Sequence, residues 1–175
     1  MREEDREGSE INKTKLFYKE ALRQYDLEMD SYNTLTDKAN SILVSIGTIL
    51  TLLTIAVIQI VTSKVSPNPL LLMVLLIIPY TFLITSLLLS IESYSVSELA
   101  TINPKKLIEK YYSKSENEIL MQLISNISND LVENKKITED RSTLINQSLK
   151  SLKKGIITLI IVISVYVIIN YIFIL

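Results

Sequence analysis

The side chains that carry most enzyme chemistry are missing from this sequence. It has no histidine and no cysteine, so a Ser-His-Asp triad, a thiol nucleophile and a histidine or thiolate metal site are all excluded. Its glycines, Gly8, Gly47 and Gly155, are too far apart to form a phosphate-binding loop. Composition leaves a carboxylate metal cluster open, but the acids lie among lysines, which is typical of solvated helix faces. We therefore expect a protein that is not an enzyme and uses no cofactor.

The remaining candidates for function are polar residues inside three long windows that contain no charged residue. These windows lie between Lys38 and Lys64, between Lys64 and Glu92, and from Gly155 to Leu175. A helix crosses the bilayer core of about 30 Å with roughly 20 apolar residues, so each window is long enough. A buried helix of a soluble protein would explain one such window. Three of them predict a multi-pass protein of the cell membrane.

Polar residues within a membrane span are costly unless they have partners, so they mark candidate functional positions. None of those in the three windows is ionisable, which argues against a proton relay, a voltage sensor or a coupled transporter. Serine and threonine can bond to their own helix, and the alternative is a pore built by a homo-oligomer, because three spans cannot enclose a wide aqueous path. The candidate pore-lining or interhelical residues are Ser45, Thr48, Thr51, Gln59 and Asn170.

A second set of residues is small, and small residues let membrane helices approach closely. Four serines recur at steps of four, three and four residues on one helix face, and one glycine lies inside the first window. The predicted helix-packing face consists of Gly47, Ser86, Ser90, Ser93 and Ser97.

Long helices must position these residues. Neither proline nor glycine occurs between Gly8 and Gly47, and a heptad-like stripe runs through this stretch into the first window. We expect one helix from about Asn12 to about Ile60, whose first half stands off the membrane as a stalk. The stripe consists of Tyr18, Leu22, Tyr25, Met29, Tyr32, Thr36, Ala39 and Leu43.

Local signals set the other helix boundaries. The second helix should end near Asn103, because Pro104 disfavours helix in the residue before it. Ser115 and Glu118 form a capping box that should begin another helix. We predict a loop at residues 134–136, with Thr138 capping a further helix that continues into the last window.

The predicted fold is all-α, with three transmembrane helices, two of which extend into a cytoplasmic helical bundle. The chain should form one continuous domain. Its segments are a cytoplasmic stalk helix (1–40), a first span (41–61), an outer turn (62–69), a second span (70–91), a cytoplasmic helical region (92–154) and a third span (155–175).

The distribution of lysine predicts the orientation. The 92–154 region is rich in lysine, whereas the outer turn has only Lys64, so the positive-inside rule places the N-terminus in the cytoplasm and the C-terminus outside. Lys105 and Lys106, directly after Pro104, are candidates for contact with an anion or a lipid headgroup. The alternative is that they serve only to fix the topology.

The entry into the first window resembles a known family. Asp37, Lys38 and Ala39, followed by apolar residues and Gly47, resemble the Pycsar-type and SLATT-like transmembrane effectors of prokaryotic antiphage defence. The order of elements is similar too, with an N-terminal helix, a two-span hairpin, a Pro-Lys-Lys turn, a cytoplasmic helical stretch and a final span. The resemblance implies an effector that damages the membrane of an infected cell when a cyclic nucleotide signal triggers it. The alternative role of the motif residues is anchoring at the membrane interface and close helix packing.

The leading functional hypothesis is therefore a homo-oligomeric membrane effector or channel-like protein, gated through its cytoplasmic helices. Its expected partners are the lipid bilayer, further copies of the chain and a trigger, either a cyclic nucleotide or a cytoplasmic protein, with no nucleic acid. A non-conducting scaffold that docks a cytoplasmic partner is the main alternative, and a holin-like pore is the third.

Overall fold

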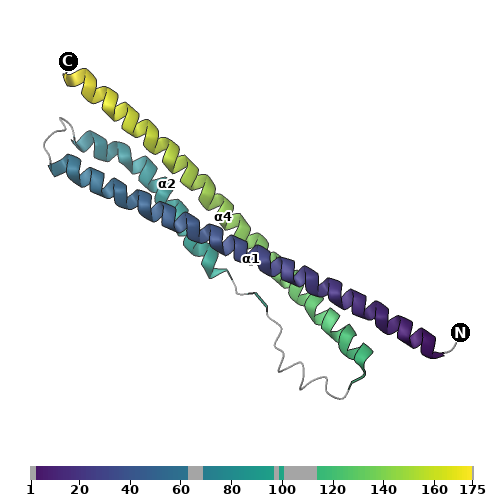
Figure 1. Ribbon diagram of the computed structural model, residues 1–175. Coiled ribbons are helices and arrows are strands. Elements are labelled where there is room, and N and C mark those ends of the chain that lie inside the picture. Colours follow the sequence, from purple (N-terminus) through teal and green to yellow (C-terminus); the bar gives the residue numbers. More distant parts are fainter. Residues whose placement is uncertain (1–2, 63–68, 97–98, 101–113, 175) are drawn as a thin grey trace. The chain divides into compact units, whose positions relative to one another are not determined.

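Three long helices make up almost all of the structure. This computed structural model describes residues 3–62, 69–96, 99–100 and 114–174, without the side chains of 3–7, 61, 69 and 170–174. The helices are α1 (Glu3–Thr62), α2 (Pro69–Ser95) and α4 (Glu116–Ile174), and these described ranges contain no strand (Figure 1). All three are long and apolar enough to cross a membrane. The predicted all-α class with three candidate spans is confirmed.

The chain divides into two compact units, and the helices α1 and α4 contribute to both of them. Unit 1 comprises Met1–Thr34 and Ser97–Asp140, and unit 2 comprises Leu35–Val96 and Arg141–Leu175. The single helix predicted from about Asn12 to about Ile60 is confirmed, because α1 has no break between Glu3 and Thr62. All eight residues of its predicted stripe are buried or half-buried.

The helix α4 is also unbroken, so the predicted loop at residues 134–136 and the predicted cap at Thr138 are wrong. Asn134, the first residue of the predicted loop, has a side chain that is fully buried. Its amide nitrogen donates to the Ala100 carbonyl at 3.2 Å, and its amide oxygen accepts from the Ala100 N–H at 2.8 Å. Tyr25 also donates to the Ala100 carbonyl, at 3.1 Å. A buried amide that is satisfied in this way does not interrupt a helix.

Hydrogen bonds of side chains bear on the boundaries of α2 and α4. The end of α2 at Ser95 shows that the boundary predicted near Asn103 is wrong. The Ala100 N–H bonds to the Asn134 side chain, which excludes the helical bond it would otherwise make four residues back. The capping box is confirmed, because the Ser115 N–H and hydroxyl both donate to Glu118 Oε2 at 3.1 Å, directly before α4 begins.

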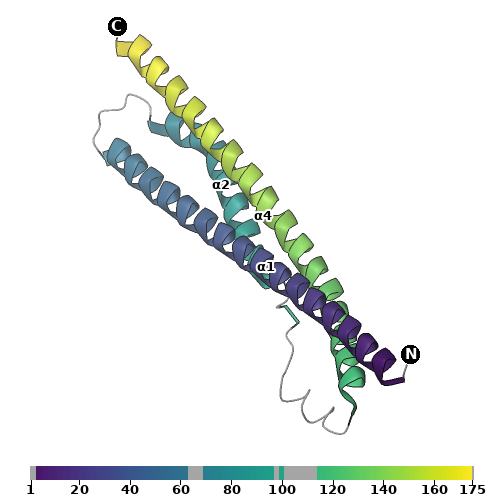
Figure 2. The ribbon, with the colours of Figure 1, turned by 45° about the vertical axis from the view of Figure 1, so that its right-hand side comes forward.

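In unit 2, α1 and α4 run parallel and α2 runs antiparallel beside both (Figure 1, Figure 2). One core cluster joins Ala39, Ile42 and Ile46 of α1 to Ile145 of α4. A second cluster joins α2 to Val162 of α4. We call the end of unit 2 that holds the first cluster its inner end, and the end that holds the second its outer end.

Candidate functional site

Polar and small side chains occupy core positions of α4. Arg141, Ser148, Gly155 and Val162 are all buried and recur at steps of seven residues, the period of a coiled-coil seam. Upstream, Asn134 of unit 1 continues the same period. Along this row of positions, the buried residues change from polar or small at Arg141, Ser148 and Gly155 to apolar at Val162.

The hydroxyls of Ser86, Ser90 and Ser148 form a closed network between α2 and α4. Ser148 Oγ lies 2.9 Å from Ser86 Oγ and 2.8 Å from Ser90 Oγ, and all three serines are fully buried. Ser86 Oγ lies 2.7 Å from the Ser148 carbonyl, and Ser148 Oγ lies 2.7 Å from the Ser86 carbonyl. Ser93, also fully buried, donates to the Ser90 carbonyl at 2.6 Å. Hydrogen bonds of this kind between helices contribute about 0.6–1.7 kcal/mol each, so the network stabilises this pairing of α2 with α4.

Two further contacts belong to this packing. The Arg141 guanidinium, 2% exposed, lies over the Tyr94 ring at 5.2 Å from its centroid, and the Tyr94 hydroxyl donates to Asn40 Oδ1 on α1. At Gly155 a Cβ would meet Leu83 Cδ2 at 3.0 Å, so the absence of a side chain lets α2 and α4 approach.

The candidate pore residues of α1 lie on a different face. Ser45, Thr48, Thr51 and Gln59 are all exposed, whereas the packed face is marked by buried Ile46. The three hydroxyls donate to backbone carbonyls four residues earlier, at 2.7, 2.9 and 2.8 Å. The positions 41, 45, 48, 52, 55, 59 and 62 follow one another at alternating steps of four and three, so they form a single stripe. We call this the α1 stripe.

The remaining predicted residues are divided between these faces. Gly47 is exposed, and a Cβ there would meet nothing within 4 Å, so neither α2 nor α4, as far as the structure describes them, approaches it. Asp37 and Lys38 are exposed, whereas Ala39 is fully buried in the inner cluster. Predictions for four other residues lie outside what the structure describes, namely Ser97, Lys105, Lys106 and the side chain of Asn170.

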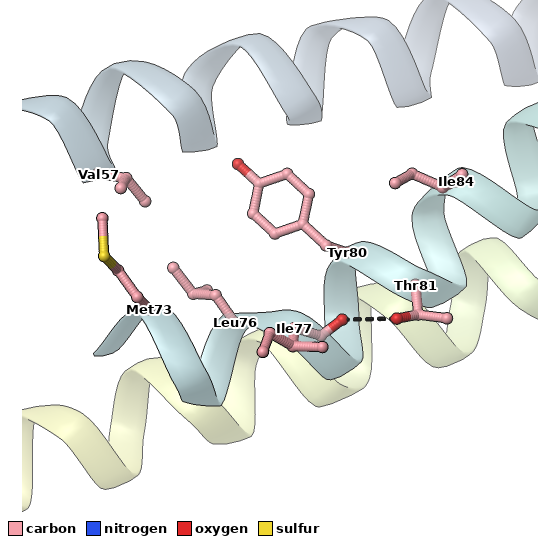
Figure 3. Close-up of a pocket in the computed structure, with 7 residues that line it drawn as sticks. All are labelled: Val57, Met73, Leu76, Ile77, Tyr80, Thr81 and Ile84. Carbon is pink, nitrogen blue, oxygen red and sulfur yellow. Dashed lines mark hydrogen bonds between the residues drawn. The ribbon is translucent and has the colours of Figure 1, made fainter. Parts of the chain in front are cut away.

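A cavity of about 420 Å³ lies between α1 and α2 in unit 2. Figure 3 shows Val57 of α1 facing Met73, Leu76 and Tyr80 of α2 across it. The Tyr80 hydroxyl is 3.5 Å from Thr54 Oγ1. The lining contains no acidic or basic side chain, so the cavity fits hydrocarbon rather than a charged ligand.

The three apolar windows are staggered along unit 2. The window of α2 ends at Glu92 and that of α1 begins after Lys38, and both boundaries lie near the level of the Tyr94–Asn40 contact. The window of α4 begins only after Lys154, whose Nζ lies 5.9 Å from the centroid of the Phe82 ring. Phe82 is ten residues from Glu92, which is about 15 Å along a helix. Lysine at the centre of a bilayer costs about 2.5–3.5 kcal/mol on insertion scales.

Sequence reasoning missed Asn134, Arg141, Ser148 and Gly155 as packing residues. The signal that could have found them is their exact spacing of seven residues, which differs from an apolar heptad stripe only in that its members are polar or small. No family model, curated protein or solved structure matches the chain.

Proposed function

We propose that the chain is a homo-oligomeric, channel-like membrane effector that is gated through its cytoplasmic helices. The observation that carries the proposal is the α1 stripe, in which five of the seven residues are polar although the stripe faces away from α2 and α4. In a bilayer this stripe would meet either lipid or another copy. Polar side chains on membrane helices favour protein neighbours or water over lipid, which supports an assembly with the stripe inside.

The composition of the α1 stripe supports a gate. Its inner part has Ser41, Ser45 and Thr48, its middle has Leu52 and Ile55, and its outer part has Gln59 and Thr62. Leu52 and Ile55 are 62% and 48% exposed, so both are available to a partner or a pore. A hydrophobic constriction between polar sections blocks ions by excluding water.

Regulation through the cytoplasmic part is supported by helix continuity. Both α1 and α4 pass without a break from unit 1 into unit 2, so a trigger bound by unit 1 acts on helices that also form the spans. The resemblance to Pycsar-type and SLATT-like effectors adds a role in antiphage defence, with a cyclic nucleotide or a protein partner as the trigger.

Ion flux across liposomes that contain the purified chain tests the proposal. Replacing Thr48 by Val together with Gln59 by Leu should lower the flux, because it removes two of the five polar side chains of the α1 stripe. The matched control replaces Thr81 and Thr85 by Val, since both are exposed threonines of α2 that bond to their own helix. Replacing Leu52 by Ser should raise the flux without a trigger. Liposomes that stay tight with every candidate trigger would refute the proposal.

A non-conducting scaffold is the second candidate, and exposed apolar residues of unit 1 favour it. Leu16, Phe17, Met121 and Val132 are each at least 60% exposed in unit 1 of the isolated chain. Such residues can hold a cytoplasmic protein. A stoichiometric partner captured by the full-length chain, without any leakage from liposomes, would favour the scaffold over the channel.

A further inference from the structure

The stagger of the apolar windows has a consequence for water inside the membrane. Three exposed lysines of α4, Lys150, Lys153 and Lys154, lie beyond the inner boundary of the α1 and α2 windows. Two contacts fix their level. Ser148 bonds to Ser86 and Ser90, and Gly155 packs against Leu83. The lysines between residues 148 and 155 are therefore level with the part of α2 between Leu83 and Ser90, inside the second window.

A bilayer centred on α1 and α2 would place Lys154 about 15 Å inside its inner boundary, near the midplane of a core of about 30 Å. Extending a lysine side chain covers only roughly half of that distance, so snorkelling cannot bring its ammonium group to the headgroups. Lysines at this depth require water or anions around them.

A slide of α4 along α2 would bring the lysines out of the bilayer core, but the packing between the two helices opposes it. Sliding α4 so that its own window is centred would break the contacts of Ser148 with Ser86 and Ser90 and would move Gly155 away from Leu83. After such a slide, another residue of α4 would lie opposite Leu83 in place of Gly155. That residue would carry a Cβ, for which there is no space at this position.

The charged side chains of unit 2 make the electrostatic field around these three lysines positive. Its described residues contain five basic side chains, Lys38, Arg141, Lys150, Lys153 and Lys154, against two acidic ones, Asp37 and Glu92. Both acids lie at the inner boundary, whereas the three lysines lie deeper, so the field at that depth is positive.

We propose that water reaches α4 within the membrane to the level of Gly155, and that Lys150, Lys153 and Lys154 make this recess a site for small inorganic anions. The inference rests on the part of the proposed function that places the three helices in a bilayer, and it does not depend on conduction. A free phosphate ion and a lipid phosphate are the two candidate ligands, and both present an anionic oxygen group to the lysines.

Cysteine chemistry tests the proposal cleanly, because the chain has no native cysteine. In membrane vesicles, K154C should react with a sulfonate-bearing methanethiosulfonate applied from the inner side. The matched control is I161C, an exposed position seven residues further along the same face, which should not react. The anionic reagent should modify K154C on the order of tenfold faster than a trimethylammonium reagent of the same class. Changing Lys150 and Lys153 to Gln should abolish that preference.

A second measurement tests the register itself. S86C with S148C should form a disulfide in membranes, because the two hydroxyl oxygens are 2.9 Å apart. S86C with S142C, nearly two turns away on α4, should not. Failure of the first pair to cross-link, or cross-linking of the second, would overturn the inference by showing another register.

The remaining outcomes are equally decisive. A disulfide at the first pair with an unreactive K154C would mean that the recess is dry, and equal rates for the two reagents would mean that it does not attract anions. Added inorganic phosphate should slow the labelling of K154C in zwitterionic vesicles. Slowing only after anionic lipid is added would assign the site to lipid headgroups and overturn the free-anion form. Liposome flux is measured separately, so loss of conduction with a reactive K154C would refute the channel alone.

Discussion

Gly155 lies in α4 and Gly47 in α1, and the structure predicts opposite effects when these two helical glycines are replaced. A Cβ on Gly155 would lie 3.0 and 3.1 Å from Leu83 Cδ2 and Cγ and 3.4 Å from Phe82 Cβ. Leu83 is itself fully buried, so it has little room to move. A Cβ on Gly47 would meet nothing within 4 Å.

The magnitudes follow from overpacking and helix propensity. Gly155→Ala costs about 1–3 kcal/mol through overpacking, and alanine recovers about 1 kcal/mol through helix propensity, which leaves a net loss of about 0–2 kcal/mol. Gly155→Leu adds three further carbon atoms at the same place, so we expect a loss of about 3 kcal/mol or more. Gly47→Leu gains about 1 kcal/mol, because only propensity changes.

Reversible unfolding of the monomer in detergent, followed by far-ultraviolet circular dichroism, measures these differences in the free energy of unfolding. The double variant with Leu83→Ala and Gly155→Ala should lose less stability than the sum of its single changes, because the smaller residue makes room for the new Cβ. If Gly155→Leu were as stable as the original chain, the close packing of α2 and α4 would be refuted. If Gly47→Leu weakened only the oligomer, Gly47 would belong to an interface between copies.

Two further predictions concern unit 1. Asn134→Leu removes both hydrogen bonds to Ala100 and should lower the free energy of unfolding by about 1–3 kcal/mol, whereas the exposed Asn146→Leu should change it by less than about 0.5 kcal/mol in the same unfolding assay. The hydrogen bond from Arg23 chiefly, together with that from Gln24, lowers the pKa of Glu20 to about 2, and Arg23→Ala should raise it toward 4.5 in a carboxyl carbon-13 NMR titration. Because the folded-state pKa is the lower one, the contribution of this contact to stability is present above the unfolded pKa and is lost as the pH falls toward 2.

The long helices were predictable because their signals are local. Charge-free windows, the α1 heptad stripe and the Ser115–Glu118 capping box each depend on residues that are close in sequence. The prediction failed at Asn134, where a polar residue was assigned to a loop although it occupies a core position of α4. The end of α2 was also misplaced, because the backbone of Ala100 is held by a residue 34 positions away.

The axial register between helices was not predictable in the same way. Hydrophobic periodicity states which face of a helix is buried, but sliding one helix past another by seven residues keeps every apolar stripe in place. The charge-free windows alone would fit three helices whose apolar stretches begin and end at common levels. The contact of Lys154 with Phe82 shows instead that α4 is displaced in unit 2.

Polar core residues explain why that displaced register is the stable one. A slide of α4 by seven residues would bring either Arg141 or Gly155 to the position that Ser148 now occupies beside Ser86 and Ser90. In the first case a guanidinium would leave the Tyr94 ring for a site built for hydroxyls, and in the second the serines would lose their partner. Either loss is specific to a polar contact, whereas apolar side chains would repack with little change. The register of unit 2 is therefore determined by its few buried polar groups, even though that leaves the apolar windows out of line.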